Sequence, residues 1–262
     1  MYTLRVFQLC AKASKVMLLS IAIGGSAVAA PVIASYDFTG APQSTTGTGS
    51  GNEWVFADQN GSAQTATVTT WADVGPDELE KATLHQLADL RNAGLGSCNS
   101  LETDCLTKGN IRAITESNGK DWILIMFSEA VNLTDFTLAP DLGMKKNPQS
   151  QFIDTTYFTG FINDSDDLLG ASYSDLTARF GLTSHTADGY GKTAVPVTIN
   201  ANTVAGGEVW GNTILIGGDT AAASGAERIL LQGFTTVVPV PPAIWLFMSA
   251  LGVLAGKRRT AG

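Results

Sequence analysis

The acidic cluster at residues 163–167, with the sequence NDSDD, carries the most suggestive chemistry in this chain. Asp164, Asp166 and Asp167 offer closely spaced carboxylate oxygens, which are the ligands that Ca²⁺ takes in proteins. The cluster lacks the glycine and the distal glutamate of an EF-hand loop, so it matches no specific metal motif. A solvated acidic turn explains the same residues, because Asp and Asn are common in turns. The sequence therefore identifies no particular metal for Asp164, Asp166 and Asp167.

Residues that could carry catalysis are few. The sequence has two histidines and none of the H-E-x-x-H, paired C-x-x-C, G-x-S-x-G, P-loop or dinucleotide-binding motifs. Ser184, His185 and Asp188 have the chemistry of a triad, but triad members usually converge from separate elements. A carboxylate pair such as Glu129 and Asp135 could serve glycoside hydrolysis, yet nothing in the sequence singles out these two. The sequence therefore predicts no cofactor and assigns no catalytic residue.

The chain ends in an apolar stretch that is followed by basic residues. Fourteen uncharged residues fill 243–256, and counting back to Val237 gives 20, about the length that a membrane helix needs. A final strand is the alternative, but the stretch is too long for a typical strand. Trp245 suits a membrane interface near the outer end. Under the positive-inside rule, three residues are expected to stay cytoplasmic, with the body outside: Lys257, Arg258 and Arg259.

The first 30 residues have the order of a secretory signal peptide. Three basic residues up to Lys15 precede an apolar run over 16–23, and small residues lead to a cleavage site expected after Ala29 or Ala30. Signal peptidase is therefore an expected partner, and export through the inner membrane is the expected route. The chain divides into a signal peptide (1–30), an extracytoplasmic domain (31–237) and a C-terminal segment (238–262).

The body between these two end segments is strongly acidic. It holds all 24 acidic residues of the chain against ten basic residues, a net charge of −14. Such a charge argues against nucleic acid and against anionic lipid as partners of the body.

Cys98 and Cys105 are the cysteines that remain after the signal peptide, which contains Cys10. An even pair in an exported chain favours a disulfide. Two free thiols, or half of a metal site, are the alternatives.

Short strands account for most of the body. Residues 65–72 alternate with a period of two, and the continuously apolar run 122–127 predicts a strand that is covered on both faces. About ten strands predict an all-β fold, a jelly-roll-like β-sandwich, with a barrel as the alternative. The other expected strands lie within 35–40, 53–57, 111–115, 130–139, 152–162, 194–200, 203–210, 212–217 and 227–238.

One stretch of the body, residues 77–94, favours a helix. Leu79, Ala82, Leu87 and Leu90 recur at roughly helical spacing, and Gly94 is placed to end the helix. A strand pair is the alternative, because the leucines are few.

Four tryptophans of the body could stack on sugar rings if they are exposed. Core packing is the ordinary role of a tryptophan in a strand, and we expect it for Trp122 within the apolar run. The other three are Trp54, Trp71 and Trp210.

The tail resembles the sorting signal of PEP-CTERM proteins, in the variant whose motif is Val-Pro-Leu-Pro-Ala. The resemblance rests on a proline-rich motif, an apolar segment and a basic cluster in that order. Val240 replaces the usual Leu and Pro242 the usual Ala, which leaves the subtype of the sorting enzyme open. The residues of the motif are Val238, Pro239, Val240, Pro241 and Pro242.

This resemblance implies processing by an exosortase, a membrane transpeptidase-like enzyme of Gram-negative bacteria that make exopolysaccharide. The mature protein is then expected at the cell surface or in the extracellular matrix, with membrane contact only before processing and exopolysaccharide as an expected partner. Residues 94–98 and 121–138 are also similar to that family's surface domains, which implies a β-sandwich but names no ligand. We expect a structural or glycan-binding, non-catalytic protein. A secreted carbohydrate-active enzyme and a permanent single-pass membrane anchor are the alternatives.

Overall fold

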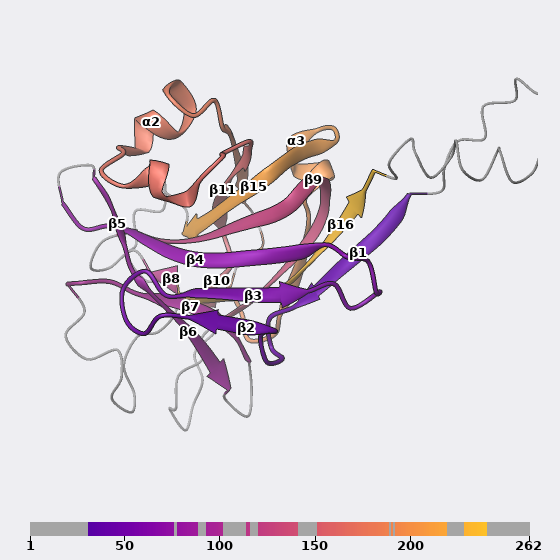
Figure 1. Ribbon diagram of the computed structural model, residues 1–262, viewed down its shortest axis with the longest axis horizontal. Helices are drawn as coiled ribbons and strands as arrows, with labels where there is room; N and C mark the ends of the chain where they lie inside the picture. Colours follow the sequence, from indigo (N-terminus) through magenta and orange to yellow (C-terminus); the bar gives the residue numbers. More distant parts are fainter. Residues whose placement is uncertain are drawn as a thin grey trace, which may run out of the picture. The chain divides into compact units, whose positions relative to one another are not determined.

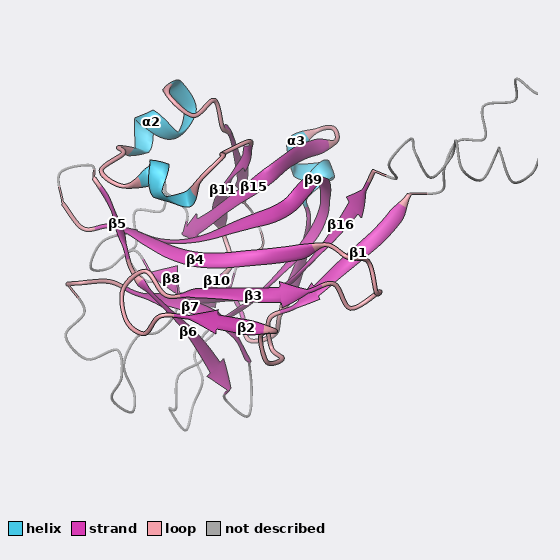
Figure 2. Ribbon diagram, viewed as in Figure 1, coloured by secondary structure: helices cyan, strands magenta, loops and turns pink. Residues whose placement is uncertain are grey.

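A computed structural model describes residues 31–75, 78–88, 93–101, 114–115, 120–140, 151–188, 190, 192–218 and 228–239. All of these except Pro31 belong to one compact unit, Val32–Pro239. The all-β prediction is confirmed, because the unit is built on a large antiparallel sheet with a few short helices (Figures 1 and 2). Within the described residues, no helix is long and apolar enough to cross a membrane. The predicted signal helix and C-terminal membrane helix lie outside them.

The longest strand, β9 (Lys120–Pro140), organises the sheet. Its first half pairs with β4 (Thr65–Asp73) and with most of β15 (Val209–Gly218). Its second half pairs with β14 (Val197–Asn200), with β16 (Arg228–Val238) and with the start of β15. One strand thus joins two groups of strands. The remaining strands are β1 (Val32–Asp37), β2 (Ser44–Thr46), β3 (Glu53–Ala57), β5 (Leu79–Lys81), β6 (Thr83–Ala88), β7 (Ala93–Cys98), β8 (Ile114–Thr115), β10 (Gln151–Phe152), β11 (Thr155–Gly160), β12 (Thr183–Ala187) and β13 (Lys192–Thr193).

The main core draws buried side chains from both halves of β9. Ile123 and Ile125 from the first half and Phe136 from the second belong to one cluster, together with Phe234 of β16. Burial of this apolar surface is the main favourable term that holds the two groups of strands together.

A second apolar cluster covers the opposite face of the first half of β9. Trp122 and Leu124 of β9 pack there with Trp71 of β4, beneath a segment that contains the 3-10 helix η1 (Ser165–Leu168) and α2 (Tyr173–Ala178). In Figure 1 this segment lies beside the sheet, near β5 and β11. Trp122 is 1% exposed. The prediction of a strand buried on both faces, with Trp122 in the core, is therefore confirmed.

The helix predicted over 77–94 is wrong, because the described part of this stretch forms β5, β6 and the start of β7. Leu79 packs in the second cluster and Leu84 in the main core, so the apolar residues do not form one helical stripe. Asn52 holds Leu84 extended, since its amide accepts from the Leu84 N–H (2.7 Å) and donates to the Leu84 carbonyl (2.9 Å). Gly94 lies inside β7, where a Cβ would come within 2.8 Å of the Leu231 carbonyl oxygen.

The strand predicted over 203–210 is also wrong in its first part. α3 (Ala201–Ala205) begins at the cap Asn200, whose side chain accepts from the Thr203 N–H. The helix ends at Gly206, which adopts a left-handed conformation with φ of 71° that glycine tolerates. β15 starts after this turn, at Val209.

The two ends of the compact unit are neighbours in the sheet. β1 and β16 pair antiparallel along their whole shared length, from Val32 opposite Val238 to Asp37 opposite Gly233. Figure 1 shows the two strands side by side. The first described strand and the last one therefore close against each other.

Candidate functional site

The outer face of β1, β16, β9 and β14 carries a polar groove of about 390 Å³, which we call the Gly233 groove. Alternation along each strand places its polar side chains outward, while their neighbours Tyr36, Phe136, Ile199 and Phe234 point into the main core. The groove is lined by Ser35, Tyr36, Asp37, Thr39, Asp135, Thr137, Thr198, Gln232, Gly233, Phe234 and Thr235.

The strand register explains why this face is hollow. The register places one residue from each of four strands in a single row across the sheet: Asp37, Gly233, Thr137 and Thr198. Because the second of these residues is a glycine, the row has no side chain at that position. The pairing of β16 with β9 shifts by a bulge just before Gly233. A Cβ at this glycine would lie 2.6 Å from the Tyr36 carbonyl oxygen. The backbone of Gly233 thus forms the floor between Asp37 and Thr137, which are two strand spacings, about 10 Å, apart.

Asp37 forms the wall of the groove on the β1 side. Its Oδ1 accepts hydrogen bonds from both the backbone amide and the hydroxyl of Thr39, at 2.8 and 2.6 Å. Among the described residues, none donates to Oδ2. The carboxylate is therefore held in place by one oxygen and offers the other as an acceptor.

Asp135 lies on the β9 side of the same face. Its Oδ1 accepts from the side-chain amide of Asn200 at 3.0 Å, and Asn200 is itself fixed as the cap of α3. In the described part of the chain, Oδ2 of Asp135 has no donor either. The arrangement suits binding of a donor-rich ligand.

Trp210 adds an exposed aromatic ring to the same sheet. Its neighbour Val209 points into the core, so Trp210 faces outward, and it is 41% exposed. Its indole N–H donates to the carboxylate of Glu208 at 2.8 Å, which fixes the ring. Trp210 pairs with Asn132, which in turn pairs with Val237, two rows along the sheet from the pair of Asp135 and Thr235. Of the four tryptophans considered for sugar stacking, Trp71 and Trp122 are buried and Trp54 packs against the main core.

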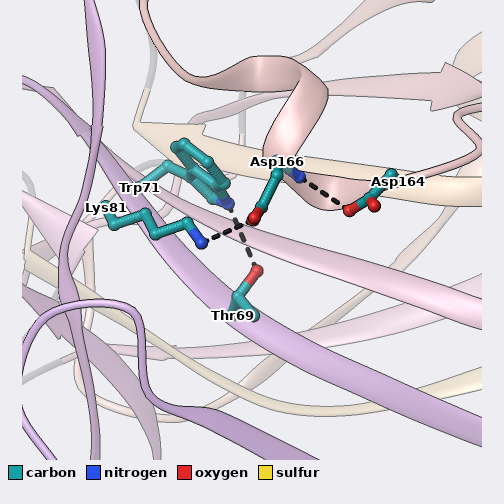
Figure 3. Close-up of polar contacts among 5 residues, drawn as sticks. All are labelled: Thr69, Trp71, Lys81, Asp164 and Asp166. Carbon is teal, nitrogen blue, oxygen red and sulfur yellow. Dashed lines mark hydrogen bonds and ion pairs between the residues drawn. The ribbon is translucent and has the colours of Figure 1, made fainter.

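The acidic cluster lies beside a second groove of about 350 Å³, on the outer face of β4. Asp164 caps η1 by accepting from the Asp166 N–H, and Asp166 forms an ion pair with Lys81 at 2.5 Å. Figure 3 shows these two contacts and Trp71, whose indole N–H donates to the Thr69 hydroxyl at 3.2 Å. Lys81 also lies 5.9 Å from the Trp71 ring centroid.

These contacts give the acidic cluster a structural role. Asp164 and Asp166 are engaged in capping and ion pairing, and Asp167 is exposed. Among the residues that the structure describes, no group of three or more His, Cys, Asp or Glu side chains could hold a metal ion. The cluster anchors the segment that covers the second apolar cluster.

Ser184 and His185, two of the three residues considered for a triad, are neighbours on β12, where successive side chains point to opposite faces of the sheet. His185 stacks on the Tyr157 ring, with centroids 4.9 Å apart, and its Nε2 lies 3.3 Å from the Thr159 hydroxyl. Burial lowers the pKa of His185 below its ordinary value. The imidazole is therefore packed against β11 in its neutral form.

Other predicted site residues fall partly outside the described residues. Cys98 is disulfide-bonded, but the predicted partner Cys105 is not among the described residues, so the pairing stays a prediction. Glu129 lies on β9 and its backbone carbonyl accepts from Gln64 at 3.2 Å, but it does not line the Gly233 groove with Asp135.

The predicted sorting motif begins inside the fold. Val238 is the last residue of β16 and only 8% exposed, and Pro239 follows it. The rest of the predicted motif and the membrane flank lie outside the described residues: Val240, Pro241, Pro242, Trp245, Lys257, Arg258 and Arg259.

Comparison with known proteins leaves the site to be interpreted from its geometry. No family model matches the chain, and no curated protein is significantly similar to it.

Sequence reasoning named Asp135 but missed Asp37, Thr137, Thr198 and Gly233. A signal was present for Gly233, because a glycine inside a strand pattern often marks a bulge or a close approach of two backbones. The other three become a site only through cross-strand register, which the sequence alone does not supply.

Proposed function

We propose that the chain is an exported protein of a Gram-negative bacterium, displayed on the cell surface or in the extracellular matrix after processing of its tail by an exosortase-type enzyme. Its body, which we propose to be a jelly-roll-like β-sandwich, binds glycan through the Gly233 groove. The sequence patterns support the proposed signals at the two ends of the chain. The all-β fold supports the proposal of a folded domain between them.

The pairing of Val32 with Val238 is the observation that carries the proposal of processing at both ends. Signal peptidase is proposed to cut after Ala29 or Ala30, just before β1, and the sorting motif starts at the last residue of β16. Removal of the residues before Pro31 and after Pro239 therefore leaves all described strands and their pairing intact. A domain that is displayed without its ends needs such a boundary.

Truncation after Pro239 tests the sorting proposal without shortening β16. We expect the truncated protein to appear in the medium, whereas the full chain stays with the cell surface or matrix. A second variant, with Lys257, Arg258 and Arg259 all changed to Gln, keeps the motif and the apolar segment, and we expect it to be sorted poorly. Fractionation with immunoblotting measures both. Unchanged surface display after the truncation would overturn the proposal.

Mass spectrometry of the mature C-terminus separates processing from permanent anchoring. The proposal predicts that residues 257–262 are missing from the surface form. Recovery of the intact C-terminus from that form would favour a single-pass anchor.

The glycan-binding part of the proposal rests on the groove and the exposed ring beside it. Four threonines and two carboxylates offer the hydrogen-bond partners that sugar hydroxyls need, and an exposed indole offers a face on which a sugar ring stacks. We expect Trp210→Ala to weaken binding of neutral oligosaccharides about tenfold, which corresponds to a loss of about 1.4 kcal/mol. Titration calorimetry with an oligosaccharide series measures this. Absence of binding by the parent protein to every glycan of the series would refute it.

A further inference from the structure

The Gly233 groove has a charge pattern that narrows the class of glycan, if the proposal of glycan binding holds. Asp37 and Asp135 both line the groove, and the described lining residues include no Lys, Arg or His. Glu208, which immediately precedes β15, adds a third carboxylate beside Trp210. The groove therefore presents negative charge with no neutralising cation of its own.

The hydrogen-bonding groups of the groove also favour a cationic ligand. Oδ2 of Asp37 and Oδ2 of Asp135 accept nothing from the described chain, while Oδ1 of each is held by Thr39 or Asn200. An ammonium group has three donors and no acceptor, so it matches carboxylate oxygens that are fixed but still have capacity. A uronic acid brings a carboxylate, which like-charge repulsion would exclude.

The width of the groove suits a sugar that carries such a group. Its floor is the bare backbone at Gly233, and the Asp37 and Thr137 positions stand about two strand spacings apart, roughly 10 Å. This width admits one sugar ring with a substituent directed at the floor. Thr137 and Thr198, whose hydroxyls lie 3.0 Å apart, remain along one side for contacts to ring hydroxyls.

We propose that the Gly233 groove binds glycans that carry protonated amino groups, such as a hexosamine polymer that has lost part of its N-acetyl groups, and rejects uronic-acid polymers. This proposal rests on the proposed glycan-binding function and specifies its ligand. The overall acidity of the body, with 24 acidic residues in the chain, favours association with the same class.

The test compares three oligosaccharides of equal length with the full-length exported protein. Glucosamine, N-acetylglucosamine and galacturonic acid oligomers supply cationic, neutral and anionic probes, at a pH that keeps the amines protonated. We expect the glucosamine oligomer to bind at least tenfold more tightly than the neutral one, and the anionic one not to bind measurably. The advantage of the cationic probe should shrink as ionic strength rises, because salt screens surface charge.

Isosteric variants locate the effect in the groove. Asp37→Asn and Asp135→Asn should each reduce the preference for the cationic over the neutral probe about threefold to tenfold, because an amide offers the ammonium group no charged acceptor. Asp167→Asn removes the same charge from an exposed residue outside the groove and is the matched control. Thermal unfolding of each variant confirms that it is folded.

The outcomes separate this inference from the function on which it rests. Equal binding of cationic and neutral probes, or a preference that survives both groove variants, overturns the proposed ligand class but leaves glycan binding standing. Binding of none of the probes overturns both.

Discussion

The backbone amide of Ser35 donates a 2.7 Å hydrogen bond to Oδ1 of Asp58, and this contact closes the edge of β1 that does not pair with β16. The turn that carries Asp58 also bonds to β1 through the Asn60 side chain, which donates to the Ile33 carbonyl at 3.0 Å, and through the Gln59 amide, which donates to the Ser35 carbonyl at 2.8 Å. An open edge would be a template for pairing with other chains, so the turn protects the strand that forms one wall of the groove.

Asp58→Ala is expected to lower the free energy of unfolding by about 2 kcal/mol, because backbone amides that donate to the charged carboxylate in the parent protein lose their acceptor. The amides of Ser35, Asn60 and Ser62 all donate to this carboxylate, which is only 7% exposed. We also expect weaker glycan binding, since Ser35 and Asp37 are on β1. Urea unfolding measures the first effect and calorimetric titration the second. A variant as stable as the parent would show that the turn does not hold β1.

The hydrogen bonds to Asp58 also predict that the stability of the fold depends on pH. Burial alone would raise the pKa of Asp58, but the hydrogen bonds from Asn60, Ser35 and Ser62 outweigh it and lower the pKa below its ordinary value. A lowered folded-state pKa contributes stability above the unfolded value of about 3.9, and this contribution is lost as the pH falls through the folded value. Asp58→Asn should therefore flatten the loss of stability below about pH 4. Parallel acid unfolding curves for the parent and the variant would contradict this.

The sequence predicted the elements whose signal is local. Residues 122–127 are apolar without interruption, and the prediction of burial on both faces is confirmed because neighbouring side chains enter different clusters. What covers the second face was not predicted. The covering segment has helices of only four and six residues, too short to produce a helical periodicity.

The helix prediction for residues 77–94 failed because apolar residues of this stretch pack in two different clusters. Leu79 and Leu84 satisfy a loose helical pattern, yet each belongs to a different cluster. The Gly233 groove was beyond sequence reasoning for another reason. It requires Asp37, Gly233 and Thr137 to meet across three strands, and this register depends on a bulge and on the packing of Tyr36 and Phe234 beneath.

Gly217 of β15 lies directly over the indole of Trp122, and we expect Gly217→Ala to destabilise the fold by about 1–3 kcal/mol, in the range for overpacked cores. A Cβ at this position would overlap the six-membered ring of Trp122, which is buried and fixed between Phe158 and Tyr173. Chemical denaturation measures the change. Gly207→Ala is the matched control, because no heavy atom lies within 4 Å of a Cβ built there. Equal effects of the two substitutions would contradict the packing argument.

Asp166→Asn tests whether the acidic cluster is structural. The pair with Lys81 is partly exposed, with 35% of the Lys81 side chain and 65% of the Asp166 side chain accessible, so we expect a loss of at most about 1 kcal/mol. High salt should abolish the difference from the parent, because it screens exposed pairs. Thermal melts at low and high ionic strength measure both. A large rise of the parent's melting temperature with Ca²⁺, absent in Asp166→Asn, would instead indicate a metal site.

His185 gives the body a second acid-sensitive contact. Burial lowers the pKa of its imidazole, so the folded state binds a proton less readily than the unfolded state. Stability from the neutral ring is therefore full above the unfolded pKa of about 6.5 and decreases as the pH falls below it, until the folded-state pKa is passed. His185→Phe keeps a ring against Tyr157 but cannot take up a proton, so the variant should lose less stability than the parent between neutral and mildly acidic pH. Urea unfolding at a series of pH values measures this, and an unchanged slope in the variant would show that His185 does not titrate on unfolding.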